Sequence, residues 1–221
     1  MSVKSQIESI RESLPSGVEL VAVSKTHPAE AVSAAYAVGQ RKFGESRPQE
    51  LKAKWEVLPR DIEWHMIGHL QTNKVKMVVP YVTLIESLDS LRLAEAIERE
   101  AAKCDKIVDC LLEVHVAQEE SKTGWNYEEL KSAVESGVFD QMPHIRLRGV
   151  MGIASNTYDE SVVRRDFEQL RLCKEELSVF FGPEFDTLSM GMSDDYELAV
   201  ECGSTSVRVG SKIFGARDYS I

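Results

Sequence analysis

The sequence has 221 residues, and its 26 Lys and Arg residues against 36 Asp and Glu residues give a formal net charge of −10 at pH 7. Its composition, 43% hydrophobic and 28% charged, is that of a folded globular protein and excludes an intrinsically disordered chain. Nucleic acid is not expected as a partner, because each phosphate that a protein neutralises requires a Lys or Arg on a shared surface.

The start of the chain predicts an amphipathic helix, because charged residues separate the apolar residues Val3, Ile7, Ile10 and Leu14. A signal peptide would need an unbroken apolar stretch there. No later run approaches the roughly 18 apolar residues of a membrane span, and neither end carries a lipidation signal. We therefore expect a cytoplasmic protein with no membrane partner.

The cysteines lie far apart in the sequence, at Cys104, Cys110, Cys173 and Cys202. No C-x-x-C pair occurs, so the sequence predicts neither a zinc site nor a redox pair. We expect reduced thiols that are buried or half-buried, and no bound metal.

A repeating pattern follows the first helix: a short apolar, β-branched run, then a longer segment of helical periodicity. The apolar runs predict strands at residues 18–25, 42–46, 63–70, 83–89, 107–116, 145–153, 186–192 and 206–215. The segments between them predict helices near residues 30–38, 48–55, from 72, 90–103, 127–136, 159–178 and 194–202. Gly39 and Gly137 mark two helix ends, and Ser90 or Asp89 is a candidate helix N-cap.

Strands that alternate with helices predict βαβ crossovers and a parallel sheet, the pattern of an α/β protein. An open doubly wound sheet and a closed barrel share this local pattern. About eight units in roughly 200 residues fit the lower size range of a TIM barrel, so we favour a single-domain (β/α)8 TIM-like barrel. No linker divides the chain, so residues 1–221 are predicted as one domain, with residues 1–16 as an extra N-terminal helix.

In a parallel barrel the active site lies at the carboxyl ends of the strands. Lys25 closes the first strand; facing inward it would be desolvated and nucleophilic toward carbonyls, and the alternative is a surface lysine. Arg208, Gly210 and Ser211 close the eighth strand and Ser193 follows the seventh, where TIM barrels commonly bind phosphate, although the glycines could equally be turn glycines. A lysine opposite a phosphate site suggests an aldehyde phosphate, for which pyridoxal 5′-phosphate (PLP) is the obvious candidate.

Several long motifs carry a resemblance to a known family. They are AVSKTHP (22–28), RKFGESRPQE (41–50), EWHMIGHLQTNK (63–74), RLRGVMGI (146–153) and LSMGMSDDYELAVECGSTSVRVGSKIFGARDY (188–219). In this order they resemble the pyridoxal phosphate homeostasis protein family, the YggS/PROSC group, with its cyanobacterial branch as a narrower candidate. The resemblance spans about residues 18–219.

The resemblance implies a role for each residue of the predicted phosphate and lysine sites. Lys25 would carry PLP as a Schiff base, and Ser193, Gly210 and Ser211 would hold its phosphate. Arg208 would approach the pyridine nitrogen, where its cation disfavours protonation of the ring and so weakens the electron sink.

Two further residues are assigned to the cofactor by the same resemblance. His65, in WHMIG, would lie on the inner mouth near the ring, with a hydrogen-bonded core histidine as the alternative. Ser46 stands where many members of the family read asparagine in FGEN, so its hydroxyl is expected to replace that contact or leave it missing. No residue is assigned a catalytic role.

The predicted fold also resembles the N-terminal barrel of alanine racemase, whose added β-domain supplies a second catalytic base. Because the sequence ends at Ile221 without such a domain, we expect little or no racemase activity. The resemblance implies a PLP-binding protein of intracellular vitamin B6 and amino-acid or keto-acid homeostasis, with PLP-dependent apoenzymes as candidate recipients. The alternatives are a PLP-dependent racemase or lyase, or a regulatory partner of another protein. Without a dimerising module, a monomer is expected.

Overall fold

The computed structural model describes residues 2–119 and 121–216 and contains a closed barrel of parallel strands in chain order. The strands are β1 (Glu19–Val23), β2 (Lys42–Glu45), β3 (Glu63–Met66), β4 (Leu84–Leu88), β5 (Val108–Glu113), β6 (Ile145–Met151), β7 (Thr187–Ser189) and β8 (Ser206–Val209). The barrel closes where β1 pairs with β8, with Glu19 opposite Ser206 and Ala22 opposite Val209. The predicted TIM-like barrel is therefore confirmed, and the open sheet is not.

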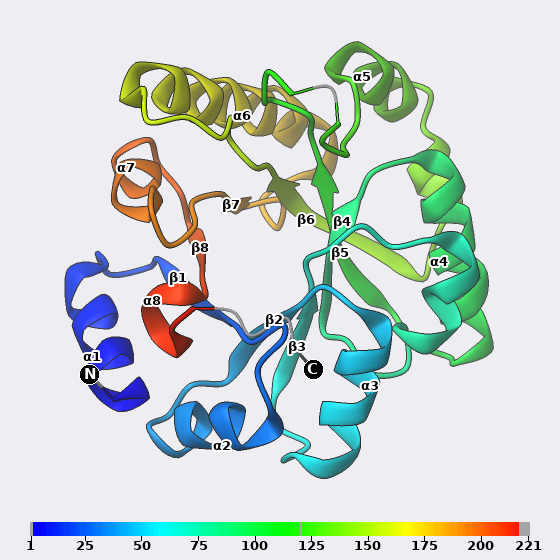
Figure 1. Ribbon diagram of the computed structural model, residues 1–221. Coiled ribbons are helices and arrows are strands. Elements are labelled where there is room, and N and C mark those ends of the chain that lie inside the picture. The colour runs from blue at the N-terminus through cyan, green and yellow to red at the C-terminus, as the bar shows by residue number, and fades with distance from the viewer. Residues whose placement is uncertain (1, 120, 217–221) are drawn as a thin grey trace.

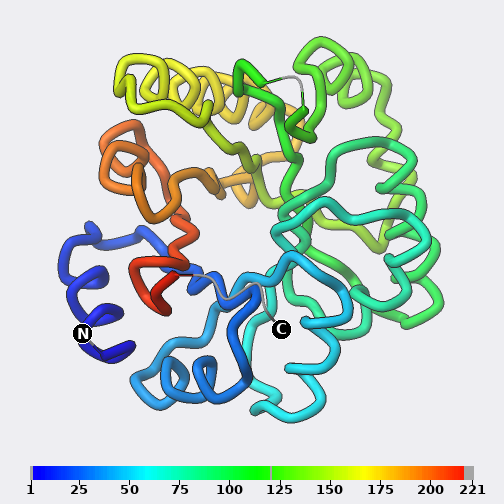
Figure 2. The backbone as a smooth tube through the Cα atoms, in the orientation of Figure 1, coloured from blue at the N-terminus to red at the C-terminus, as the bar shows by residue number. Residues whose placement is uncertain are grey.

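Helices surround the barrel, one after most strands (Figures 1 and 2). They are α1 (Val3–Ser13), α2 (Ala29–Ala37), α3 (Pro48–Val57), η1 (Thr72–Met77), α4 (Leu91–Lys103), α5 (Tyr127–Glu135), η2 (Val138–Gln141), α6 (Glu160–Phe181), α7 (Tyr196–Glu201) and α8 (Ser211–Phe214). The extra helix α1 packs beside α2 and α8. Ser90 caps α4 as predicted, because its hydroxyl accepts the N–H of Leu93.

The main hydrophobic core lies between the outer face of the barrel and the helices. Phe43 on β2 and Trp64 on β3 are fully buried there, with ring centroids 5.9 Å apart. Phe167 and Leu170 of α6 are buried on the same side of the barrel wall. Fully burying such a side chain contributes roughly 1.5–3 kcal/mol, so this layer supplies much of the stability that holds the strand ends in place.

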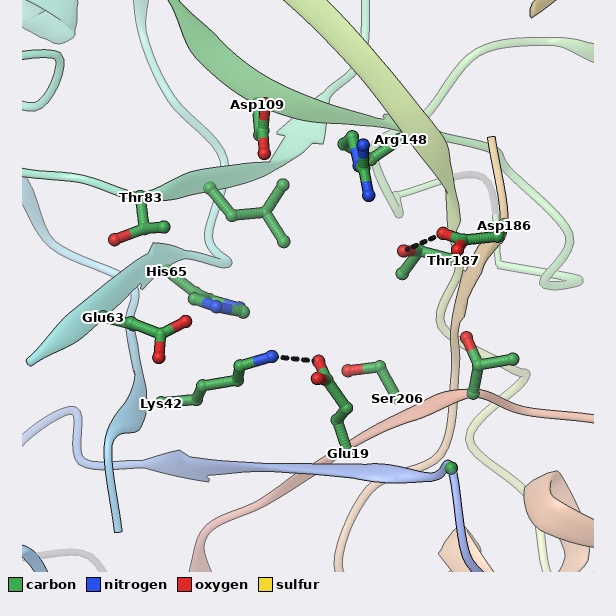
Figure 3. Close-up of a pocket in the computed structure, with 13 residues that line it drawn as sticks. Glu19, Lys42, Glu63, His65, Thr83, Asp109, Arg148, Asp186, Thr187 and Ser206 are labelled. Carbon is green, nitrogen blue, oxygen red and sulfur yellow. Dashed lines mark hydrogen bonds and ion pairs between the residues drawn. The ribbon is translucent and has the colours of Figure 1, made fainter. Parts of the chain in front are cut away.

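The inside of the barrel carries polar as well as apolar side chains, whereas apolar layers fill most TIM barrels. Residues from the first positions of the strands, among them Glu19, Lys42, Glu63 and Ser206, line a cavity of about 410 Å³ at the amino-terminal mouth (Figure 3). Since side chains alternate along a strand, the residues two positions further on form the next inward layer. Arg208 belongs to that layer.

The structure differs from the sequence predictions at the last two strands. The run 186–192 forms only the short strand β7, because Gly191 adopts a φ of +94° and a Cβ there would lie 2.5 Å from the Cβ of Ala199. The run 206–215 stops at Val209, and α8 begins at Ser211. The segment from residue 72 is a 3₁₀ helix, and the short 3₁₀ helix η2 was not predicted.

Within residues 2–119 and 121–216, none of the helices combines the length and the apolar character needed to cross a bilayer. The four cysteines are free thiols as predicted, although Cys104 is exposed rather than buried or half-buried. The assignment of residues 1–221 to one domain stays a prediction.

Candidate functional site

A cavity of about 140 Å³ opens at the carboxyl ends of the strands. Its polar lining brings together residues that the sequence analysis selected, namely Lys25, Ser193, Arg208, Gly210 and Ser211. The remaining wall is formed by Val23, His27, Ile67, Ile153, Met192 and Asp194. An amine, a hydroxyl, a guanidinium and glycine backbone thus converge on one small space.

Lys25 reaches this cavity from the turn that follows β1. Val23, the last residue of β1, lines the cavity, and Lys25 lies two positions further along the chain. Lys25 itself lies in a turn, closed by the N–H of His27, which donates to the carbonyl oxygen of Ser24 at 3.1 Å, and this turn places the lysine at the mouth of the barrel. The side chain is half-buried rather than on the outer surface.

A buried ion pair holds the backbone before Lys25. The ammonium of Lys54 on α3 donates to the carbonyl oxygen of Ser24 at 2.7 Å and to the carboxylate of Glu45 at 2.6 Å. The Ser24 hydroxyl donates to the same carboxylate at 2.7 Å. Burial raises the pKa of Glu45, although Lys54 and Ser24 lower it. Breaking such a pair by removing one partner is strongly destabilising, so the position of Lys25 is tied to β2 and α3.

The backbone after Lys25 is held from the same side. The N–H of Thr26 donates to the carboxylate of Glu50 at 2.8 Å, and Arg47 donates to the other oxygen of that carboxylate at 3.1 Å. Thr26 has a φ of +66°, a conformation that costs a non-glycine residue about 1–3 kcal/mol unless its surroundings enforce it. The turn that presents Lys25 is therefore a fixed feature and not a loose loop end.

The opposite wall of the cavity is formed by the loops after β7 and β8. The N–H of Gly210 donates to the hydroxyl oxygen of Ser193 at 3.2 Å, which joins the two loops. The Ser193 hydroxyl proton is not used in this bond and can be donated into the cavity. A Cβ on Gly210 would lie 3.2 Å from the carbonyl oxygen of Val23, so glycine permits this close approach. Ser211 opens the single-turn helix α8.

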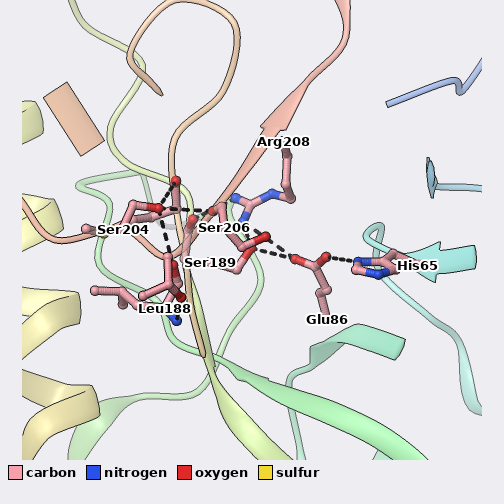
Figure 4. A network of polar contacts seen from close by, with 10 residues as sticks. His65, Glu86, Leu188, Ser189, Ser204, Ser206 and Arg208 are labelled. Carbon is pink, nitrogen blue, oxygen red and sulfur yellow. Dashed lines mark hydrogen bonds and ion pairs between the residues drawn. The ribbon is translucent and has the colours of Figure 1, made fainter. Parts of the chain in front are cut away.

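Arg208 lies below these loops, 4% exposed, in a row of buried polar side chains that crosses the barrel (Figure 4). Its guanidinium donates to the hydroxyl of Ser189 and, at 2.9 Å, to the carbonyl oxygen of Gly152. It also lies 3.6 Å from the carboxylate of Glu86. These contacts fix the plane of the guanidinium while the side chain still lines the cavity.

Glu86 is the centre of this row and is fully buried. One carboxylate oxygen accepts from Ser189 at 2.6 Å, and the other lies 2.7 Å from Nδ1 of His65. Burial by itself would raise the pKa of Glu86, but His65, Arg208 and Ser189 together hold that pKa below its ordinary value. Glu86 is therefore an anion whose charge faces Arg208 on one side and His65 on the other.

His65 is brought to the barrel interior but not to the cavity that Lys25 lines. It is 4% exposed, hydrogen-bonded to Glu86, and lines the cavity at the amino-terminal mouth instead (Figure 3). The structure thus places it in the arrangement weighed as the alternative, a hydrogen-bonded histidine of the core.

Ser46 is likewise outside the cavity lined by Lys25. It follows the last residue of β2 and is half-buried. A Cβ on Gly68 would lie 2.7 Å from its Cβ, so Ser46 packs closely against the chain after β3. Its contact with a cofactor stays a prediction.

Sequence reasoning missed two polar residues that organise the site, Glu86 and Ser189. Both lie in runs predicted as strands, and the signal for Glu86 is a charged residue in the middle of the predicted strand TLIESLD (83–89). A carboxylate in such a run requires a buried partner, but the sequence does not say which one. The apolar wall residues Ile67 and Ile153 were also missed.

Comparison with known proteins places the chain in a family. The family model for the N-terminal domain of alanine racemase matches residues 2–218. The pyridoxal phosphate homeostasis protein of Vibrio alginolyticus is 39% identical over 211 residues, covering 93% of this chain and 89% of that protein.

Solved structures agree with this assignment. The structure of PipY from Synechococcus elongatus with PLP bound has a TM-score of 0.88 and 37% identity, covering 97% of this chain and all of PipY; the structure without PLP has a TM-score of 0.90. Alanine racemase from Bartonella henselae, at 14% identity and a TM-score of 0.74 over 99% of this chain and 60% of that enzyme, shares the fold. The chain belongs to the pyridoxal phosphate homeostasis protein family, which is built on the alanine racemase N-terminal domain.

Proposed function

We propose that this protein binds PLP in the cavity at the carboxyl ends of the strands and takes part in PLP and amino-acid or keto-acid homeostasis. The observation that carries the proposal is the convergence of Lys25, Ser193, Arg208, Gly210 and Ser211 on one cavity. The relative PipY, of which a structure with PLP bound is known, supports it.

The residues present fit the chemical groups of PLP. When bound, PLP supplies an aldehyde that condenses with a primary amine, and Lys25 is the amine that lines the cavity. The Ser193 hydroxyl and the backbone at Gly210 and Ser211 lie on the opposite wall, where an anionic phosphate would find hydrogen-bond donors. Arg208 would lie beside the ring nitrogen.

Arg208 also favours storage of the cofactor over its use in catalysis. A guanidinium stays protonated at physiological pH, and Glu86 and Ser189 hold it in place. A cation beside the ring nitrogen disfavours protonation of the ring, which weakens the electron sink that carbanion chemistry needs. We therefore propose little or no turnover, with PLP-dependent apoenzymes as recipients, in a cytoplasmic monomer.

The binding proposal is tested by borohydride reduction of the protein with PLP. We expect the visible absorption to disappear and the reduced adduct to map to Lys25 by mass spectrometry. Lys25→Ala should lose the covalent adduct, whereas Lys42→Ala should retain it, because Lys42 lies at the other mouth of the barrel. An undiminished adduct in Lys25→Ala would overturn the assignment.

The proposal of little turnover is tested by incubating the loaded protein with a panel of L-amino acids. We expect D-enantiomers and keto acids to form no faster than with free PLP at the same concentration. Sustained turnover well above free PLP would instead favour a racemase or lyase. Such a result would leave the Lys25 assignment intact, because an enzyme of that class also needs the lysine.

A further inference from the structure

A buried carboxylic acid at the end of β5 faces a second cavity. Glu113 is 4% exposed, and its Oε1 accepts from the hydroxyl of Thr123 at 2.9 Å. Its Oε2 is buried and has no hydrogen-bond partner. The side chain lines a cavity of about 190 Å³, together with Val114, His115, Ser121, Lys122, Thr123 and Ile153.

This cavity adjoins the one that Lys25 lines, because Ile153 forms part of both walls. Glu113 faces the barrel interior by the alternation that directs Asp109, four residues earlier on β5, into the amino-terminal cavity. The volume is well above the roughly 10–15 Å³ that a single water requires. It is large enough for a small organic molecule.

The cationic and aromatic nitrogen groups of this cavity already have partners. The Lys122 ammonium donates to the carbonyl oxygen of Ala154 at 2.6 Å and lies 3.3 Å from the carboxylate of Glu119. Nε2 of His115 lies 2.9 Å from the carbonyl oxygen of Glu119. Neither side chain has a hydrogen bond or ion pair with Glu113 among these contacts, so the acceptor at Oε2 is not satisfied by them.

We propose that this cavity binds a small organic ammonium ion, whose N–H group donates to Oε2 of Glu113 while its alkyl part packs against Val114 and Ile153. A buried acceptor without a partner costs about 1–3 kcal/mol, which a bound donor recovers. A cation suits it better than a neutral donor, because a charge-assisted hydrogen bond to a carboxylate is roughly twice as strong as a neutral one.

Binding is coupled to loss of a proton from Glu113. The pKa of Glu113 is raised to about 7, chiefly by burial; Asp89 after β4 contributes to the rise, while Thr123, Arg208 of β8 and His69 after β3 oppose it. Below that pH the empty site holds a carboxylic acid. An entering ammonium ion then displaces the carboxyl proton to solvent, and the resulting carboxylate pairs with the cation. Affinity should therefore rise with pH and level off above about 7.

The test uses trimethylammonium as the probe, in calorimetric titrations of the full chain at about pH 6 and about pH 8. Trimethylammonium keeps the charge and one N–H donor but cannot condense with an aldehyde. Its signal is therefore independent of whether PLP is present, and failure of the PLP proposal would leave this result interpretable. Repeating the titration in two buffers of different protonation enthalpy counts the protons released.

We expect saturable binding that is tighter at the higher pH, with release of up to one proton at the lower pH. Glu113→Gln should weaken binding by about tenfold or more and abolish the proton release. Glu63→Gln is the matched control, because it removes one carboxylate at the other mouth of the barrel; it should leave binding unchanged. The neutral alcohol tert-butanol, of similar size and with one O–H donor, should bind more weakly than trimethylammonium.

Three results would overturn the proposal. They are the absence of saturable binding in the wild-type protein, an affinity that Glu113→Gln leaves unchanged, and an affinity without pH dependence or proton release. Near-ultraviolet circular dichroism of both variants shows whether the fold is retained, and Thr123 can still donate to the glutamine amide oxygen.

Discussion

Glu86→Ala is expected to lower the free energy of unfolding by about 3–5 kcal/mol, the usual cost of removing one partner from a buried ionic group. The side chain is fully buried and lies against His65, Ser189 and Arg208. The substitution leaves the Arg208 cation in the barrel without a facing anion and leaves a cavity beside it. Urea denaturation followed by tryptophan fluorescence measures the change.

Glu95→Ala on α4 is the matched control for this prediction. Glu95 is exposed, so its removal should change stability by no more than about 0.5 kcal/mol. Glu86→Gln should fall between the two, because an amide keeps hydrogen bonds but not the charge. A loss below about 1 kcal/mol in Glu86→Ala would show that the row from His65 to Arg208 does not depend on the carboxylate.

The buried polar row from His65 to Arg208 also raises the question of why charged side chains lie inside the barrel. Replacing a whole buried ionic group by apolar residues of similar volume is often neutral or stabilising, whereas removing one member is costly. Stability alone therefore does not explain why Glu86 and Arg208 are present. A need for a guanidinium in a fixed position beside the upper cavity explains them, because an arginine held by Ser189 and Gly152 has little freedom to turn.

The order of elements was predictable from the sequence because each strand of the barrel is a short apolar run followed by helical periodicity. The closing of the barrel followed from the number of such units. The ends of β7 and β8 were not predictable to the residue, since Gly191 turns the chain after β7 and α8 starts directly after Gly210. Hydrophobicity does not distinguish a strand residue from the apolar residue of a single-turn helix such as Ile213.

The lysine and phosphate walls of the candidate site were predictable because they lie at strand ends. Lys25 follows the first strand, Arg208 lies in the eighth and Ser193 follows the seventh, and all three line one cavity. Alternation directs His65 inward, but it does not give the depth of the ring in the barrel: the ring contacts Glu86 and lines the amino-terminal cavity. Partners from distant strands decide such depths, and a single sequence does not reveal them.

As pH rises from about 4.5 to about 7, the free energy of unfolding of the wild-type protein is expected to fall relative to that of Glu113→Gln. The pKa of the buried carboxyl is raised from 4.5 to about 7 by desolvation. Between these values the folded protein holds a proton that the unfolded chain has released, so the free energy of unfolding falls with pH. At roughly 1.4 kcal/mol per pKa unit, the full difference amounts to roughly 3 kcal/mol.

Subtracting the unfolding free energies of the two proteins at each pH isolates Glu113, because all other titrating groups are common to both. Below about pH 4.5 the difference should be constant, and above about pH 7 it should be constant again, with the glutamine variant favoured by the full amount. A flat difference across this range would mean that Glu113 ionises as an exposed glutamate does. If the ammonium site is real, trimethylammonium should stabilise the wild type more at high pH than at low pH, since only the carboxylate needs a cation.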